Sequence, residues 1–222
     1  MKNTIVGILA FQGSVAEHIE TTRFAASKLK MAVEIVLVRT KESLSGLDAL
    51  IIPGGESTTH YKLCVEAGMW EEMKKIGNIF GTCAGAIMMA KKVAHPGVGQ
   101  KTLELMDIEI DRNAYGSQIN SFAKVLKTTL GEIEGVFIRA PKIKRVGAGV
   151  KVLAFNDKEP CACEQTTGNK YYLAACFHPE FTTPLFHEHF LNRLLKSPRL
   201  LKSPRLLKSP RLLKSKLSPR QE

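Results

Sequence analysis

The chain has 222 residues, of which 44% are hydrophobic and 24% charged. This length suits one large domain or two small ones, and the composition can build a buried core, which excludes a wholly disordered protein. The formal net charge is +11, but the last 27 residues, with nine Lys or Arg and one Glu, account for +8 of it. The other 195 residues carry +3, so the body of the chain does not have the composition of a nucleic-acid-binding protein.

The apolar runs and the cysteines exclude further classes of protein. The longest apolar runs, such as residues 86–90, are far too short to cross a bilayer. No charged start followed by an apolar segment opens the chain, so we expect no secretory signal. Five cysteines, an odd and scattered number, do not form a disulfide framework. We therefore expect a cytoplasmic, soluble protein.

The first half of the chain alternates strand-like and helix-like segments. Apolar, often β-branched runs predict strands at residues 4–10, 33–38, 47–53 and 76–80. Helical spacing of apolar residues predicts helices at about 14–30, at 57–67 and from about 86 to 93. Continuously apolar strands that alternate with helices indicate a mainly parallel sheet that is covered on both faces.

The second half is richer in short strands separated by turns. We expect these strands at residues 108–110, 118–125, 136–138, 150–155, 162–165 and 171–177. A final helix begins near Pro184. The sequence thus predicts a single flavodoxin-like α/β domain over residues 1–195, with a mainly parallel central sheet and a smaller antiparallel addition.

Cys83 occupies a turn between a predicted strand and a predicted helix, flanked by Gly81 and Gly85. Such a turn pushes the side chain outward, as in a nucleophile elbow, and the glycines permit the tight backbone. The start of the following helix would favour the thiolate. On these residues alone, a nucleophile and a buried structural cysteine are equally good interpretations.

Two further segments follow predicted strands and should reach the same edge of the sheet, where ligands of open α/β sheets bind. His178 can take a thiol proton, and Glu180 can orient its ring. Residues 53–57, Pro-Gly-Gly-Glu-Ser, can turn backbone N–H groups toward an oxyanion. Taken singly, each segment is more simply a solvated loop or a turn. With Cys83 they form a candidate Cys-His-Glu triad.

These segments, in this order, resemble class I glutamine amidotransferase domains, and especially the glutaminase subunits of pyridoxal 5′-phosphate synthase. The resemblance covers residues 4–195. It rests on Phe-Gln-Gly at 11–13, Pro-Gly-Gly-Glu-Ser-Thr-Thr at 53–59, Gly-Thr-Cys-Ala-Gly at 81–85, Arg-Asn-Ala-Tyr-Gly-Ser-Gln at 112–118, Phe-Ile-Arg-Ala-Pro at 137–141 and His-Pro-Glu at 178–180. It implies the fold of that class and hydrolysis of L-glutamine to L-glutamate and ammonia.

The resemblance also implies a role for each matching residue, and no cofactor or metal. Cys83 is the expected nucleophile, which forms a glutamyl thioester; His178 is the general base and acid; Glu180 orients it. The other expected roles are L-glutamine binding by Gly55, Glu56, Ser57, Arg112, Ile138 and Arg139, an oxyanion hole from the N–H groups of Gly55 and Ala84, and a place near the synthase interface for Gln12. The synthase subunit, in a large hetero-oligomer, is expected to activate the glutaminase and to receive its ammonia through a tunnel.

Two alternatives remain open. One is the glutaminase subunit of another amidotransferase, such as imidazole glycerol phosphate synthase, although residues 112–118 and 137–141 disfavour it. The other is a non-catalytic scaffold whose basic tail binds nucleic acid. In this tail, residues 196–222, Lys-Ser-Pro-Arg-Leu-Leu occurs three times, and a proline every six residues prevents a continuous helix. We expect a disordered tail that is dispensable for glutaminase activity.

Residues 187–189, His-Glu-His, fall in the last predicted helix. Positions two apart do not share a helix face, so these histidines do not form a metal pair, and we interpret the segment as solvated.

Overall fold

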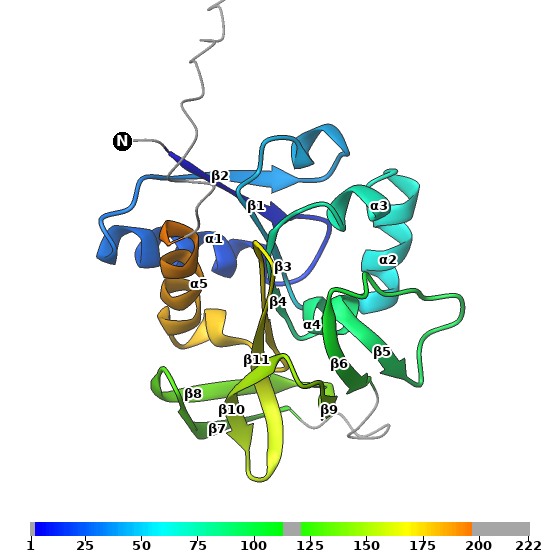
Figure 1. Cartoon of the computed structure of the whole chain (residues 1–222), viewed down its shortest axis with the longest axis vertical. Coiled ribbons are helices and arrows are strands. Elements are labelled where there is room, and N and C mark those ends of the chain that lie inside the picture. The colour runs from blue at the N-terminus through cyan, green and yellow to red at the C-terminus, as the bar shows by residue number, and fades with distance from the viewer. Residues whose placement is uncertain (1–2, 113–120, 197–222) are drawn as a thin grey trace, which may run out of the picture.

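The computed structural model describes residues 3–112 and 121–196, which form a nine-stranded sheet and a three-stranded sheet (Figure 1). Helices pack on both sides of the larger sheet. Residues 113–118 of the candidate glutamine-binding segment, and the tail after residue 196, lie outside the described residues. None of the helices in the described ranges is long and apolar enough to span a membrane.

One half of the large sheet is parallel throughout. Its strands, in spatial order, are β2 (Val33–Val38), β1 (Thr4–Leu9), β3 (Ala49–Ile52), β4 (Asn78–Thr82) and β12 (Lys170–Ala175). The three central strands are apolar and almost entirely buried, as expected for a sheet with both faces covered. The predicted parallel sheet is therefore confirmed.

The other half continues from β12 with antiparallel strands. These are β11 (Glu159–Thr167), β10 (Val150–Asn156), β7 (Ser121–Thr128) and β8 (Gly131–Ile138). The antiparallel addition is thus also confirmed. The hairpin of β7 and β8 is longer than predicted, because exposed residues such as Lys127 and Glu132 pair across it.

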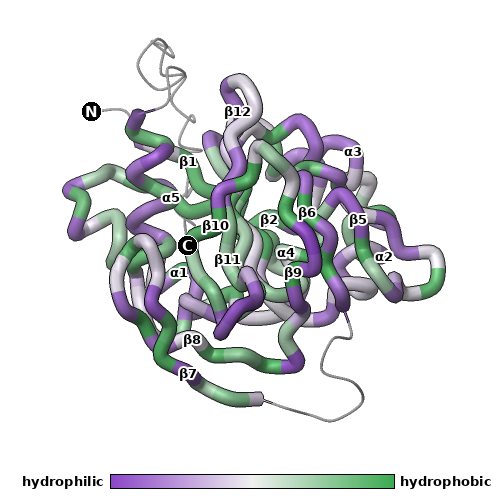
Figure 2. Tube along the Cα trace, turned by 60° about the horizontal axis from the view of Figure 1, so that its bottom comes forward, coloured by the Kyte–Doolittle hydropathy of each residue, from purple (hydrophilic) through white to green (hydrophobic). Residues whose placement is uncertain are grey.

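Two apolar cores hold the helices on the sheet. On one face lie α1 (Val15–Lys28) and α5 (Leu185–Leu195), packed on side chains that include Phe80 and Phe177. On the other face lie α2 (Ser57–Glu66), α3 (Trp70–Met73) and α4 (Ala84–Met89). Figure 2 shows hydrophobic stretches in the middle of the molecule and hydrophilic stretches along outer segments such as β5. Removal of this apolar surface from water stabilises the layered arrangement.

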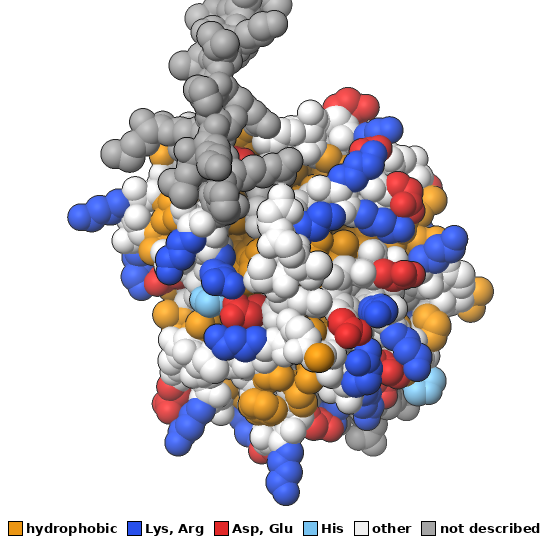
Figure 3. Space-filling model, viewed as in Figure 1, with side chains coloured by type: hydrophobic (Ala, Val, Ile, Leu, Met, Phe, Trp, Pro, Cys, Tyr) orange, Lys and Arg blue, Asp and Glu red, His pale blue; other side chains and the backbone are white. Residues whose placement is uncertain are grey.

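The helix after Cys83 is shorter than predicted. It ends at Met89, and the segment expected to continue it forms β5 (Ala90–Ala94). This strand pairs with β6 (Met106–Asp111), which in turn pairs with β9 (Lys142–Val146), an unpredicted strand. Pairing with a distant strand here overrides the local helical pattern. Ion pairs such as Lys92–Glu109 link β5 to β6, and Figure 3 shows acidic and basic side chains interleaved over this region.

Candidate active site

Four neighbouring parallel strands end at one edge of the large sheet, and a residue predicted for the site follows each of them. Gln12 follows β1, Gly55 follows β3, Cys83 follows β4 and His178 follows β12. The end of β8 joins them, because His178 N donates to Val136 O at 2.8 Å. The carboxyl edge of the sheet thus collects the predicted residues, as expected for an open α/β fold.

Cys83 lies on a sharp turn with left-handed backbone angles, φ 48° and ψ −104°. The two flanking positions must be glycine, because a larger side chain would collide with neighbouring atoms. A Cβ on Gly81 would lie 2.6 Å from Gly85 C, and one on Gly85 would lie 2.1 Å from Ile52 O. A residue other than glycine in this conformation costs about 1–3 kcal/mol, a strain typical of functional sites. The side chain is 6% exposed, and its Sγ lies 3.9 Å from Ile138 O.

His178 and Glu180 form a buried pair, with 2.7 Å between His178 Nδ1 and Glu180 Oε1. Burial by itself would lower the pKa of His178, but hydrogen bonding with Cys83 and Glu180 raises it to about 10. The ring lies against the turn after β3, where a Cβ on Gly54 would be 2.3 Å from His178 Cε1. The imidazole is therefore held between a thiol, a carboxylate and a glycine that leaves room for it.

Glu180 stays ionised at neutral pH. Burial would raise its pKa, but His18, His178 and the hydroxyl of Ser14 lower it to about 2. Ser14 Oγ donates to Glu180 Oε1 at 2.6 Å, and Thr21 Oγ1 donates to the Glu180 carbonyl at 3.0 Å. Ser14 directly precedes α1 and Thr21 lies in the middle of it, so this helix fixes Glu180 beside His178.

Gln12 pairs with the loop after β3 through both ends of its amide. Its Nε2 donates to Glu56 O at 2.7 Å, and Glu56 N donates to its Oε1 at 3.3 Å. Gly55, between Gly54 and Glu56, has φ 123°, a conformation that favours glycine. Gln12 therefore braces the loop that carries the candidate oxyanion donor Gly55, while Ala84, the other candidate, begins α4 directly after Cys83.

The structure places the other predicted glutamine-binding residues around this loop. Arg112 Nη2 donates to Glu56 Oε1, which also accepts from Thr58 Oγ1 at 2.8 Å. Partial burial would raise the pKa of Glu56, but Thr58 and Arg112 lower it. Ser57 is buried at the start of α2, and its Oγ has no hydrogen-bond partner within the described ranges.

The β8 end supplies the last two predicted residues. Ile138 is 37% exposed beside Cys83, and Arg139 follows it with an exposed side chain and φ 44°. The predicted site residues therefore lie on turns, loops or element ends around one edge of the sheet. Across the described ranges, no group of three His, Cys, Asp or Glu side chains is arranged to hold a metal ion.

The sequence did not predict the histidines behind Glu180. His18 Nε2 lies 3.5 Å from Glu180 Oε1, and His18 Nδ1 lies 2.9 Å from His187 Nε2. The interpretation of His187 as solvated is wrong, because its side chain is 1% exposed. It lies on the face of α5 that packs against Phe80 of β4, a contact that helical spacing alone does not reveal.

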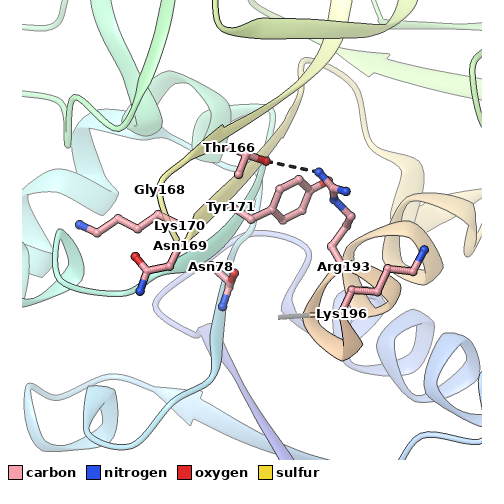
Figure 4. A pocket seen from close by; sticks show the side chains of 8 residues that line it. All are labelled: Asn78, Thr166, Gly168, Asn169, Lys170, Tyr171, Arg193 and Lys196. Atoms are coloured by element: carbon pink, nitrogen blue, oxygen red, sulfur yellow. Dashed lines mark hydrogen bonds between the residues drawn. The ribbon is translucent and has the colours of Figure 1, made fainter. Parts of the chain in front are cut away.

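A separate pocket of about 170 Å³ opens near the opposite ends of β4 and β12 (Figure 4). Its lining includes Asn78, the first residue of β4, together with Lys170, Tyr171 and Arg193. None of the predicted catalytic or glutamine-binding residues lines it. The predicted site residues and this pocket therefore lie at opposite ends of the same strands.

Comparison with known proteins agrees with this arrangement. Residues 8–196 match the model of the SNO glutamine amidotransferase family. The chain belongs to this family. It is 43% identical to pyridoxal 5′-phosphate synthase subunit PdxT of Thermococcus onnurineus over 198 residues, 86% of this chain and 98% of the relative. The subunit of the same name from Thermoanaerobacter sp. is 46% identical over 196 residues, 84% of this chain and 97% of the relative.

Solved structures agree on the fold of this family member. A crystal structure described as that of a glutamine amidotransferase superposes with a TM-score of 0.72 at 43% identity, covering 85% of this chain and 98% of that one. A protein of Thermoplasma acidophilum, named as a component of a GMP synthase, superposes with a TM-score of 0.63 at 14% identity, covering 91% of this chain and all of that one. The second likeness concerns the fold alone.

Proposed function

We propose that this glutamine amidotransferase releases ammonia from L-glutamine with Cys83 as nucleophile, His178 as general base and acid, and Glu180 as the carboxylate that orients His178. One observation carries the proposal. The thiol on its strained turn and the ionised, buried Glu180 both contact His178, and together they raise its pKa to about 10. This coupling favours proton transfer from sulfur to imidazole.

The reaction has two halves. The Cys83 sulfur attacks the side-chain amide carbon of glutamine, and the N–H groups of Gly55 and Ala84 stabilise the oxygen that becomes negative. The imidazolium of His178 gives its proton to the departing nitrogen, so ammonia leaves and a glutamyl thioester remains. His178 then takes a proton from water, which attacks the thioester, and glutamate leaves as the Cys83 sulfur is released.

Charged side chains around the loop fit the two charges on the α-carbon of glutamine. Arg139 is exposed beside Ile138 and can bind an α-carboxylate through a bidentate contact. Glu56 is ionised and accepts a hydrogen bond from Arg112, so the pair offers both an acceptor for the ammonium group and a second guanidinium. We assign glutamine binding to these residues with Gly55, Ser57 and Ile138.

We assign the ammonia to a synthase subunit that makes pyridoxal 5′-phosphate in the cytoplasm, since the relatives described above are named subunits of that synthase. Ammonia diffuses away in water, so docking of the acceptor over the site would raise the yield of its transfer. Apolar side chains of Ile138 and Phe181 are partly exposed beside Cys83 and His178, and Gln12 braces the loop below. We place the synthase contact on this edge.

The test is glutamate release from L-glutamine with and without the synthase subunit. We expect turnover with the partner, and a loss of at least about 1,000-fold in Cys83→Ala. Cys64→Ala is the matched control, because Cys64 is buried in α2 away from the predicted site and burial raises its pKa to about 12. Equal activity of Cys83→Ala and wild type would overturn the nucleophile.

The identity of the acceptor subunit is tested by a second acceptor. Turnover that appears only with another acceptor, such as the imidazole glycerol phosphate synthase subunit, would keep the glutaminase chemistry and change the pathway. Absence of glutamine hydrolysis with either acceptor would contradict the proposed function.

A further inference from the structure

A chain of buried polar side chains runs from Glu180 into the space between α1 and α5. Its members are His18 of α1, Thr82 at the end of β4 and His187 of α5. His18 Nδ1 lies 2.9 Å from His187 Nε2, and His18 Nε2 lies 3.0 Å from Thr82 Oγ1. The same Nε2 is 3.5 Å from Glu180 Oε1. His18 therefore contacts both the residue before Cys83 and the carboxylate of the proposed triad.

The surroundings determine which nitrogen of His18 carries the proton. His18 Nε2 makes its hydrogen bond with Thr82 Oγ1 and also faces the Glu180 carboxylate, which would repel a lone pair, so Nε2 is the protonated nitrogen and donates to Thr82. The other nitrogen, Nδ1, then accepts a hydrogen bond from His187 Nε2. His187 Nδ1, which has no hydrogen-bond partner in the described part of the chain, is left without a proton. The reverse arrangement would bury an unpaired N–H donor and turn a lone pair toward Glu180.

Burial of the ring favours the neutral form of His18. Burial lowers its pKa, Glu180 and Glu17 oppose that change, and His178 adds to it. Burial and the neighbouring His18 lower the pKa of His187 to about 3. Both rings are thus mainly neutral at pH 7, and the Nε2–H group of His18, which donates to Thr82, turns its positive end toward Glu180.

We propose that His18 is a positioning residue, held in one tautomer by His187, which ties Thr82 to Glu180 and so sets the distance between Cys83 and the His178–Glu180 pair. The proposal rests on the proposed glutaminase function. Two contacts make the role of His18 more than packing, because its Nε2 lies 3.0 Å from Thr82 Oγ1 and 3.5 Å from Glu180 Oε1. Ser14 and His178 already occupy Glu180 Oε1, whereas Glu180 Oε2 has no hydrogen-bond partner within the described ranges. The carboxylate is thus held through one oxygen, on which His18 is a third polar neighbour beside Ser14 and His178.

The first experiment measures glutaminase kinetics of the complex with the synthase subunit. We expect His18→Leu to lower kcat about 10- to 100-fold, the usual effect of losing a partner that orients a catalytic group, with KM for glutamine within about twofold. His18→Gln keeps an N–H donor and should restore kcat to within about threefold of wild type. A variant His18→Leu with wild-type kcat, in a complex that hydrolyses glutamine, overturns this inference and leaves the proposed function intact.

A double variant separates positioning from general stability. If His18 acts through Glu180, adding His18→Leu to Glu180→Gln should cost less than about a further twofold in kcat, because the two losses share one cause. Multiplied losses, or a fall in the urea midpoint of His18→Leu that His18→Gln does not share, would indicate a structural role and overturn the inference.

The tautomers can be measured without any turnover. Nitrogen NMR of the histidine side chains in the full chain at pH 7 should show His18 and His187 as neutral rings protonated at Nε2. His187 should lose its fixed tautomer in His18→Leu. A charged ring, or protonation of either residue at Nδ1, would overturn the inference even if the chain fails to hydrolyse glutamine, an outcome that would separately refute the proposed function.

Discussion

Two buried carboxylates among the described residues have a histidine partner at the same distance, yet only one of the two histidines also contacts Cys83. The inner pair is Glu180 with His178, and the outer pair is Glu164 of β11 with His189 of α5, 2.7 Å apart in both cases. Hydrogen bonds offset burial in each carboxylate and lower its pKa to about 2. An ionised carboxylate next to a histidine is therefore not by itself a mark of catalysis.

The difference lies in what surrounds each pair. The inner histidine contacts Cys83 and Gly54 at the carboxyl ends of the parallel strands, where open α/β sheets bind their ligands. The outer carboxylate accepts instead from Tyr171 at 2.7 Å and lies 3.4 Å from Lys151. These partners satisfy the Glu164 carboxylate, and none of them is a residue of the predicted site. The position on the sheet, more than the residue types, distinguishes the site from a structural ion pair.

The sharpest way to test this comparison is the same substitution in both pairs. We expect Glu180→Gln to lower kcat about 1,000- to 10,000-fold, because His178 loses the acceptor that fixes its tautomer. Glu164→Gln should leave kcat within about twofold. Glutamate release by the complex measures both. A large loss of kcat in Glu164→Gln, without unfolding, would show that the outer pair also serves the reaction.

A smaller loss of kcat is expected when the His178 ring is displaced but not removed. In Gly54→Ala the new Cβ would lie 2.3 Å from His178 Cε1, so the imidazole must move away from Cys83. Misplacement of a catalytic group by about 1 Å costs about 100-fold in rate, and we expect that loss of kcat here.

The control for this substitution is Gly168→Ala, in the turn between β11 and β12. Its φ is 59°, and a Cβ there meets nothing within 4 Å. It carries backbone strain of about 1 kcal/mol but no clash. Unchanged kcat in Gly168→Ala and a loss in Gly54→Ala would tie the effect to His178, whereas equal losses would point to backbone strain alone.

Several of these features could be predicted from the sequence and others could not. The continuous apolar runs of β3 and β4 predict buried parallel strands, and Cys83, His178 and Glu180 stand directly after such strands. The contact of His18 with His187 joins residues 169 positions apart on two helices, and no local pattern records it. The sequence predicts a helix to about residue 93 and not its end at Met89 for the same reason, because β5 forms by pairing with β6.

The outer pair should make the stability of the folded chain depend on pH in acid. The pKa of Glu164 is about 2 in the folded chain, against about 4.3 in an unfolded one, so its stabilisation is present above about pH 4.3 and is lost as the pH falls toward 2. We expect Glu164→Gln to be about 1 kcal/mol less stable than wild type at pH 7. Urea unfolding at pH 7, 4 and 3 should show this gap closing; a constant gap would mean that charge contributes nothing.

The smallest effect is expected at the end of α5, the helix that carries both His187 and His189. Deletion of residues 196–222 removes +8 of the +11 formal charge and leaves in place the described side chains that contact either pair. Glutamate release with the synthase subunit should therefore stay within about twofold of the full chain at equal salt. If turnover falls tenfold and higher salt weakens the full-length complex to the same degree, the basic tail instead contributes to partner association, because attraction between exposed charges is screened over about 10 Å at 0.1 M salt.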